Sequence, residues 1–219
     1  MSTTLYYSPN YIRPIIPICL IKYFHANIDA VDIATKQEEF SKEFPLKKCP
    51  ALINKAQGLY LTETIAICHY IIKTFAKDPE QIKKLLGSTV LEESEILRWE
   101  SLSVSDFINR LDDYVGPLIG IMPYNAATHE KAKKDFDVVV QIYEDHLKNH
   151  KYLVGDHITL ADLTAACCFY LGFGFAFDEN WSKQYPNITR WYKEVTKSEY
   201  VNSFFFDKKP VKVFPQPPK

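Results

Sequence analysis

The segment Thr62-Glu63-Thr64 carries residue types that could hold a small ligand with two opposite charges. It opens an apolar-periodic run that predicts a helix through about Phe75. Backbone amides of a first helical turn, together with the Thr64 hydroxyl, can hold a carboxylate, which the positive end of the helix dipole favours. Glu63 can pair with an ammonium group nearby. The same residues would also make a sensible helix N-cap with no ligand, and the segment alone does not choose between the two.

A second segment, Cys49-Pro50, stands immediately before a β-prone run, and the surrounding elements must position both segments. The first part of the chain predicts the order βαβαββα, with strands and helices at Thr4–Ser8, Ile15–Phe24, Ile28–Ile33, Lys36–Phe44, Ala51–Asn54, Leu59–Leu61 and Thr62–Phe75. The last two strands are separated by a loop of hairpin length that contains Gly58, so we expect them to pair antiparallel. Pro17 falls inside the first helix, where we expect a late start or a kink.

The remainder of the chain predicts helices only. Two amphipathic stripes predict long helices, one from Leu91 to Val115 and one from Ala132 to Leu147. Thr159 and Asp162 form a reciprocal capping box, which starts a nearly uncharged helix that we expect to be buried. Trp191 and Val195 mark one more helix. We therefore predict a first domain at 1–79, an all-helical domain at 88–207, and a Pro/Lys-rich tail at 208–219 that looks like the start of a linker.

Composition and charge exclude several classes of protein. The hydrophobic content of 47% excludes a chain that is disordered throughout. The 26 basic and 27 acidic residues leave a formal net charge of −1, which gives no basic footprint for nucleic acid or an anionic membrane. No apolar run approaches the roughly 20 residues that span a bilayer. The five cysteines form no CxxC pair, and the chain begins without a signal-peptide pattern, so we expect reduced thiols and a cytoplasmic protein.

The βαβαββα order with a proline before its third strand resembles the thioredoxin-like fold. In that fold the proline is cis and exposes the backbone of the preceding residue to a ligand, and Pro50 is the matching residue here. The resemblance thus implies that the N–H and C=O of Cys49 are free to pair with an extended peptide. An ordinary trans-proline loop is the alternative.

Both segments, in order and followed by an all-helical domain, resemble the glutathione transferase fold over nearly the whole chain. Within that superfamily the chain is similar to the N-terminal domain of the gamma subunits of translation elongation factor 1. The stretches that carry this similarity are FPLKKCPAL, LTETIAI, ILRWESLSVSD, PYN, LKNHKYLVGDHITLADL and ITRWYKEV. In that family a lysine-rich linker joins this domain to a separate C-terminal domain.

The resemblance implies a binding module of the nucleotide-exchange complex of translation elongation. Such a module would dock the exchange-factor subunit and could pair with itself, with the small residues Ser101, Ser103 and Ser105 permitting close helix approach. It also implies glutathione as a possible ligand at Cys49, Pro50, Glu63 and Thr64, with no cofactor required. The alternative is an active cytosolic glutathione transferase that conjugates glutathione to electrophiles.

The candidate catalytic positions depart from the transferase pattern. Aligned on Tyr6-Tyr7-Ser8-Pro9-Asn10, Tyr11 falls where serine-type relatives carry the residue that lowers the pKa of the glutathione thiol. Tyr11 could donate its hydroxyl and Arg13 could stabilise a thiolate, while Ser8 lies too early in the strand unless the register slips. We therefore expect weak glutathione binding with poor or absent turnover.

Redox and metal chemistry have less support. Thiol exchange in this fold uses a cysteine at the start of the first helix, and Tyr11 and Ile12 occupy that place. His146 and His150 have a spacing that can bind zinc, but no third ligand is suggested. We expect no metal site.

Overall fold

The computed structural model describes residues 3–205 and 211–217. The chain forms two compact units. Unit 1 runs to Leu85 and also takes in Glu199–Phe204, whereas unit 2 begins at Leu86 and continues from Phe205. The division after Leu85 falls between our predicted domains 1–79 and 88–207, whereas Glu199–Phe204 of unit 1 lies inside the range predicted for the second domain. Residues 208–210 and 218–219 of the predicted tail lie outside the described residues.

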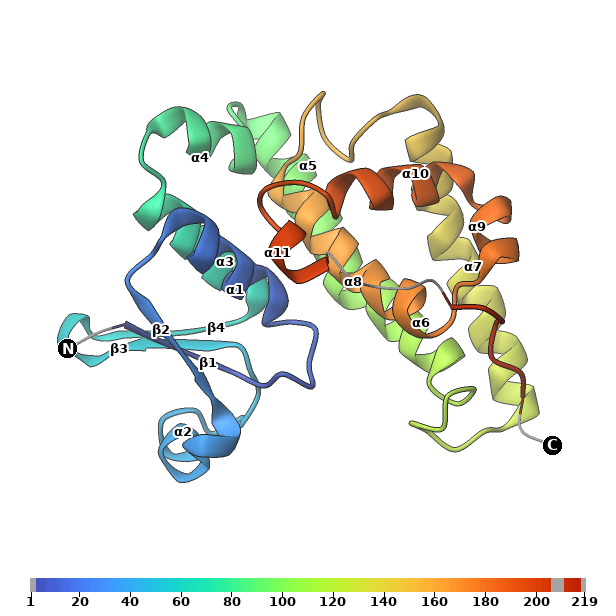
Figure 1. Cartoon of the computed structure of the whole chain (residues 1–219), viewed down its shortest axis with the longest axis horizontal. Coiled ribbons are helices and arrows are strands. Elements are labelled where there is room, and N and C mark those ends of the chain that lie inside the picture. Colours follow the sequence, from blue (N-terminus) through green and yellow to red (C-terminus); the bar gives the residue numbers. More distant parts are fainter. Residues whose placement is uncertain (1–2, 206–210, 218–219) are drawn as a thin grey trace. The chain divides into compact units, whose positions relative to one another are not determined.

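Unit 1 is a four-stranded mixed sheet with helices on both faces, which confirms the predicted thioredoxin-like order (Figure 1). The strands are β1 (Thr3–Tyr7), β2 (Ile28–Asp32), β3 (Ala51–Asn54) and β4 (Leu59–Thr62). Their order is β2-β1-β3-β4, with β2 parallel to β1 and the other pairs antiparallel. The helices are α1 (Ile15–Phe24), α2 (Gln37–Glu43), α3 (Thr64–Phe75) and α4 (Pro79–Leu86), with the short 3-10 turns η1 (Ile33–Thr35) and η2 (Lys55–Gln57). Helices α1 and α3 cover one face of the sheet, and α2 covers the other.

Strand alternation explains how β1 holds both layers. Tyr6 points toward α2, where its ring lies 5.3 Å from that of Phe40 and 6.2 Å from that of Phe44. Leu5 and its register partner Leu52 point to the opposite face and are fully buried. The end of β1 is therefore fixed from both sides of the sheet.

Helix α1 begins at Ile15, so of the two outcomes predicted at Pro17, a late start or a kink, the late start is wrong. Pro17 occupies the third helical position, where a backbone N–H would have no partner inside the helix. The next amide, that of Ile18, already donates to the Pro14 carbonyl at 3.1 Å. A proline so early in the helix therefore removes no hydrogen bond of the helical ladder.

The regular secondary structure in the described residues of unit 2 is all helical, as predicted. Its elements are α5 (Val90–Ser101), the π-helical turn η3 (Leu102–Phe107), α6 (Ile108–Val115), α7 (Ala126–Asn149), α8 (Leu160–Phe175), α9 (Glu179–Gln184) and α10 (Pro186–Val195). The short α11 (Asn202–Phe205) follows at the division between the units. Helix α8 is buried almost all round and carries the predicted capping box of Thr159 and Asp162, which confirms both expectations.

The single helix predicted from Leu91 to Val115 is interrupted by η3. Ser103 is fully buried there, and its hydroxyl lies 2.7 Å from the Trp99 carbonyl and 2.8 Å from the Tyr143 hydroxyl. A serine that bonds to the carbonyl four residues back competes with the helical ladder and loosens it. A π turn at this point accommodates that competition.

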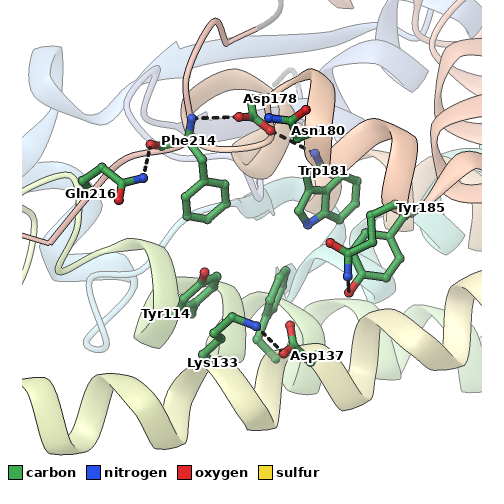
Figure 2. Close-up of a pocket in the computed structure, with 11 residues that line it drawn as sticks. Tyr114, Lys133, Asp137, Asp178, Asn180, Trp181, Tyr185, Phe214 and Gln216 are labelled. Atoms are coloured by element: carbon green, nitrogen blue, oxygen red, sulfur yellow. Dashed lines mark hydrogen bonds and ion pairs between the residues drawn. The ribbon is translucent and has the colours of Figure 1, made fainter.

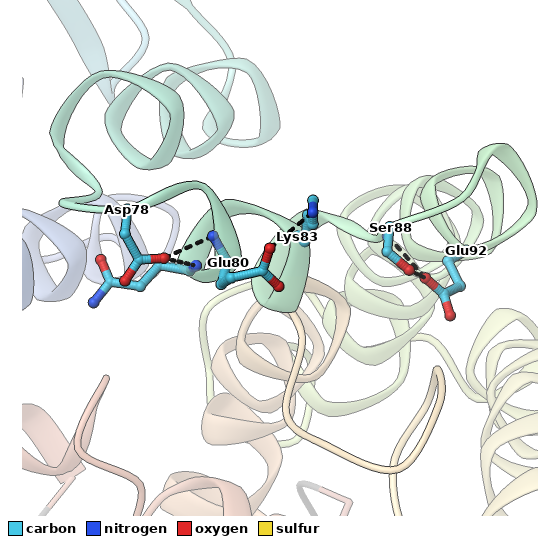
Figure 3. Close-up of polar contacts among 6 residues, drawn as sticks. Asp78, Glu80, Lys83, Ser88 and Glu92 are labelled. Atoms are coloured by element: carbon cyan, nitrogen blue, oxygen red, sulfur yellow. Dashed lines mark hydrogen bonds and ion pairs between the residues drawn. The ribbon is translucent and has the colours of Figure 1, made fainter.

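The starts of α4 and α5 are capped by side chains, each within its own unit (Figure 3). Asp78 accepts hydrogen bonds from the amides of Glu80, at 2.7 Å, and Gln81, at 3.1 Å. At α5, Glu92 accepts bonds from both the amide and the hydroxyl of Ser88. These caps fix where each helix begins without burying a charge.

Among the described residues, no helix is long and apolar enough to span a membrane.

Candidate functional site

One end of the unit 1 sheet brings together several of the predicted site residues. Ala51 pairs with Tyr6 of β1 on one side and with Thr62 of β4 on the other. Continued by one residue, these registers place Pro50 between Tyr7 and Glu63. Cys49 lies beside Ser8, whose backbone forms a hydrogen bond with the Cys49 thiol. The turn before β3 and the entrance of α3 are therefore neighbours, as the sequence analysis requires.

The peptide bond between Cys49 and Pro50 is cis, which confirms that expectation. The Cys49 side chain is buried, and burial raises the pKa of its thiol, while a hydrogen bond from the Ser8 backbone opposes that rise. A thiol with a raised pKa is a poor nucleophile near neutral pH. The weak redox interpretation of Cys49 gains no support from this environment.

Glu63 and Thr64 lie at the entrance of α3 in different environments. Glu63 is exposed, has a φ of 70°, and makes no side-chain capping bond to the helix. A bulky residue at this φ is uncommon and costs free energy, so the surrounding structure must impose it. Thr64 is buried, and its hydroxyl donates to the Arg13 carbonyl at 3.3 Å. A carboxylate at this entrance could reach the Thr64 hydroxyl only after the hydroxyl turns away from Arg13.

The three catalytic candidates are dispersed around the loop after β1. Ser8 is buried, and its hydroxyl oxygen accepts a bond from the Asn10 amide at 3.4 Å. Tyr11 is 59% exposed, and its amide donates to the Ser8 carbonyl in a tight turn. Arg13 is exposed, and its carbonyl holds Thr64. Two of the three thus shape the backbone between β1 and α1 through their carbonyls.

Asp32 is a neighbour of this site that sequence reasoning missed. It ends β2 opposite Tyr7, and its negative charge contributes to the raised pKa of the Cys49 thiol. Its carboxylate accepts the Ala34 amide at 2.9 Å and so caps η1. The signal was available, because an aspartate directly after a β-prone run is a common turn and cap residue.

The serine stripe proposed for self-association does not form one exposed face. Ser101 and Ser105 are exposed, but Ser103 is buried within unit 2 against Tyr143. That part of the expectation is wrong, because the buried Ser103 is not available to a second copy. Self-association itself stays a prediction, which sedimentation at micromolar concentration would test.

The two histidines considered for zinc cap the end of α7. The His146 and His150 rings stack at 4.2 Å, and His150 Nδ1 lies 2.8 Å from the His146 carbonyl. His146 Nε2 lies 3.3 Å from the Tyr152 carbonyl. Within the described ranges, no group of three or more histidine, cysteine or acidic side chains is placed to hold a metal ion.

Known protein families match both halves of the chain. Residues 1–73 match the family described as glutathione S-transferase, N-terminal domain, and residues 107–199 match glutathione S-transferase, C-terminal domain. The crystal structure of the GST-like domain of elongation factor 1-gamma from Saccharomyces cerevisiae superposes with a TM-score of 0.90 at 34% identity. That match covers 100% of this chain and 99% of the yeast chain.

Two yeast sequences extend this similarity. A putative elongation factor 1 gamma homolog from Saccharomyces cerevisiae is 40% identical over 89% of this chain and 87% of its own length. Elongation factor 1-gamma 1 from the same yeast is 34% identical over 94% of this chain. The match spans only 50% of that longer relative.

Proposed function

The chain belongs to the glutathione-transferase-like elongation factor 1-gamma family, and from that premise we propose that it is a binding module of the translation elongation factor 1 complex. In this role it docks the exchange-factor subunit in the cytoplasm, with poor or absent transferase turnover. The observation that carries the proposal is the combination of close similarity to elongation factor 1-gamma with the exposed Tyr11 at the position where a transferase needs its thiol-activating residue.

The chemistry of the unit 1 site supports binding over turnover. Activation of a glutathione thiol needs a hydroxyl or thiol held beside the sulfur atom by the protein. Ser8 is buried under its own turn, Tyr11 points into solvent, and the Cys49 thiol is poorly ionised. By contrast, Thr64 and the exposed Glu63 still offer a hydroxyl and a carboxylate at the entrance of a helix. This arrangement supports a module that binds glutathione weakly, with poor or absent turnover.

Docking of the exchange-factor subunit is tested by capture. The immobilised chain should retain the purified subunit applied at micromolar concentration. The Thr64→Val variant should retain it equally well, because we propose that partner docking does not need the glutathione site. Failure of both proteins to capture the subunit would remove the scaffold function. Loss of capture by the Thr64→Val variant alone would contradict the separation of the two sites.

Glutathione binding should depend on the Thr64 hydroxyl. Thr64→Val keeps the shape of the side chain but removes a hydrogen bond to a charged group, so affinity for glutathione should fall by about tenfold. Thr62→Val is the matched control, because Thr62 is an exposed threonine at the end of β4. Titration calorimetry measures both. Equal affinities of the two variants would place glutathione elsewhere.

The same preparations separate binding from catalysis. We expect no turnover of a standard electrophile above the uncatalysed rate, and no change on Tyr11→Phe, since the Tyr11 side chain is 59% exposed. Turnover typical of transferases that falls on Tyr11→Phe would instead establish the alternative, an active glutathione transferase.

A further inference from the structure

Unit 2 contains a groove lined by aromatic side chains (Figure 2). Residues 213–217, here called the C-terminal segment, lie over this groove. We define the aromatic groove by Tyr114 of α6, Phe136 of α7, and Trp181 and Tyr185 at α9. A cavity of about 370 Å³ lies within it, bounded also by Phe214 and Gln216 of the C-terminal segment. Its polar lining residues are Lys133, Asp137, Asp178, Asn180 and Gln184. This volume is in the range of small-ligand and peptide-anchor sites.

The walls of the aromatic groove are rigid because their rings pack on one another. Tyr114 stacks on Phe136 at 5.4 Å, and Trp181 contacts Tyr185 at 4.7 Å. Phe177, beneath the groove, joins the two pairs, lying 6.0 Å from Phe136 and stacked on Trp181 at 3.7 Å. All five of these residues are buried. These ring contacts hold the walls of the groove together, and walls that are already ordered reduce the entropy cost of binding.

One carboxylate in the groove is aimed at the backbone of the entering segment. Asp178 Oδ1 accepts the Trp181 amide at 2.9 Å, which caps α9 and fixes the carboxylate. Asp178 Oδ2 accepts the Phe214 amide at 3.2 Å. Asp178 is buried, and none of the ion pairs among the described residues involves it. Its charge is thus available for a charge-assisted bond to a backbone donor.

The segment suits this groove because of its prolines. In Phe214-Pro215-Gln216-Pro217 the prolines have no N–H, and a residue before proline is biased toward extended backbone. Few donors then need partners, and one of them is the amide that Asp178 accepts. The Phe214 ring lies 5.7 Å from that of Tyr114, and the Gln216 side chain folds back to the Phe214 carbonyl at 3.0 Å. Recognition of proline-rich segments by aromatic grooves uses the same low-entropy backbone.

We propose that the aromatic groove is a peptide-binding site that recognises an extended segment with an aromatic residue followed by proline, and that residues 213–217 of this chain are its occupant. The Phe214 side chain lines the groove, and the Asp178 carboxylate accepts a hydrogen bond from the Phe214 amide. The charges agree, because residues 211–219 contain two lysines and no acidic residue. The groove has two carboxylates, Asp137 and Asp178, against one ammonium group, that of Lys133, which pairs with Asp137 at 2.6 Å. The site is in unit 2, and it does not depend on the glutathione site proposed for unit 1.

Competition in the full-length chain tests the occupant. A tethered segment has a high effective concentration, so the wild-type chain should bind a labelled peptide of residues 211–219 at least about tenfold more weakly than the Phe214→Ala variant. Val213→Ala is the matched control, because Val213 is the neighbouring residue of the segment and is 69% exposed. It should behave as the wild type. Fluorescence anisotropy measures the three affinities, and a peptide with alanine in place of its phenylalanine should bind none of the proteins. Equal binding of the peptide by wild type and Phe214→Ala, or no binding by either, would overturn the proposal.

A substitution at Asp178 tests the recognised amide without removing the helix cap. In Asp178→Asn one oxygen still caps α9, which asparagine does as well as aspartate, but an NH₂ group replaces the acceptor for the Phe214 amide. In the Phe214→Ala background, this change should lower the affinity for the labelled peptide by about tenfold, because one charge-assisted bond is lost. The thermal midpoint of the protein should stay within a few degrees of its value without the change. In the otherwise wild-type chain, hydrogen exchange of the Phe214 amide should accelerate. Unchanged peptide affinity and unchanged exchange would show that Asp178 does not bind the amide of the segment.

Discussion

Replacing Asp162 by alanine should lower the free energy of unfolding by about 4 kcal/mol, because it leaves buried hydrogen-bond donors without an acceptor. The carboxylate is fully buried. Its Oδ1 accepts the Leu153 amide at 2.9 Å and the Trp191 indole N–H at 2.8 Å, and its Oδ2 accepts the Thr159 amide at 3.0 Å. Burial raises the pKa of this carboxyl, and the hydrogen bonds oppose that rise. One side chain therefore ties the loop before α8, the start of α8 and helix α10 together.

The asparagine variant and an exposed cap separate these contributions. Asp162→Asn keeps one acceptor oxygen, so it should cost about half as much as the alanine variant. Asn125 is the matched control: it also accepts two amides, those of Ala127 and Thr128 at the start of α7, but it is exposed. Asn125→Ala should cost about 1 kcal/mol, since water replaces the lost acceptor. Urea unfolding followed by circular dichroism measures all three variants. A cost for Asp162→Ala no greater than that for Asn125→Ala would contradict the argument.

The features that sequence reasoning predicted correctly are encoded by residues close together in the chain. The capping box of Thr159 and Asp162 spans four residues, and the hairpin around Gly58 is local as well. The order of strands and helices follows from apolar periodicity. The resemblance to a known fold added the cis bond before Pro50, which spacing alone left open.

The features that it missed depend on residues distant in sequence. The Thr64 hydroxyl bonds to Arg13, and the Phe214 amide to Asp178, separations of 51 and 36 residues that no local pattern reveals. Ser103 in the π turn η3 contacts Tyr143 of another helix, 40 residues further along the chain. These contacts decide whether a hydroxyl is available to a ligand and whether a small residue is exposed. The residue types of the unit 1 site were therefore predictable, while the states of their side chains were not.

Gly172→Ala should be as damaging as a large core change, at about 3 kcal/mol, although it adds only one methyl group. A Cβ at Gly172 would overlap the ring of Phe177. The ring cannot retreat, because Phe177 is only 1% exposed and stacks on Trp181 with an interplanar angle of 3°. Overpacking of a core that cannot relax typically costs about 1–3 kcal/mol and occasionally more. The Phe177 amide also donates to the Gly172 carbonyl at 2.7 Å, so the backbone holds the two residues together.

Two comparisons distinguish steric overlap from backbone effects in this prediction. Gly58→Ala places a side chain at a φ of 65° with nothing within 4 Å, so it should cost only about 1 kcal/mol, through backbone strain alone. The Phe177→Leu change removes the ring that the added methyl group would strike. The double variant, Gly172→Ala with Phe177→Leu, should therefore be more stable than the sum of the two single changes predicts. A double-mutant cycle measures this coupling. Additive costs would show that the ring is not the obstacle. Since Phe177 also supports Trp181, the single Gly172→Ala change should in addition weaken peptide binding in the aromatic groove, joining the packing of α8 to the recognition of the C-terminal segment.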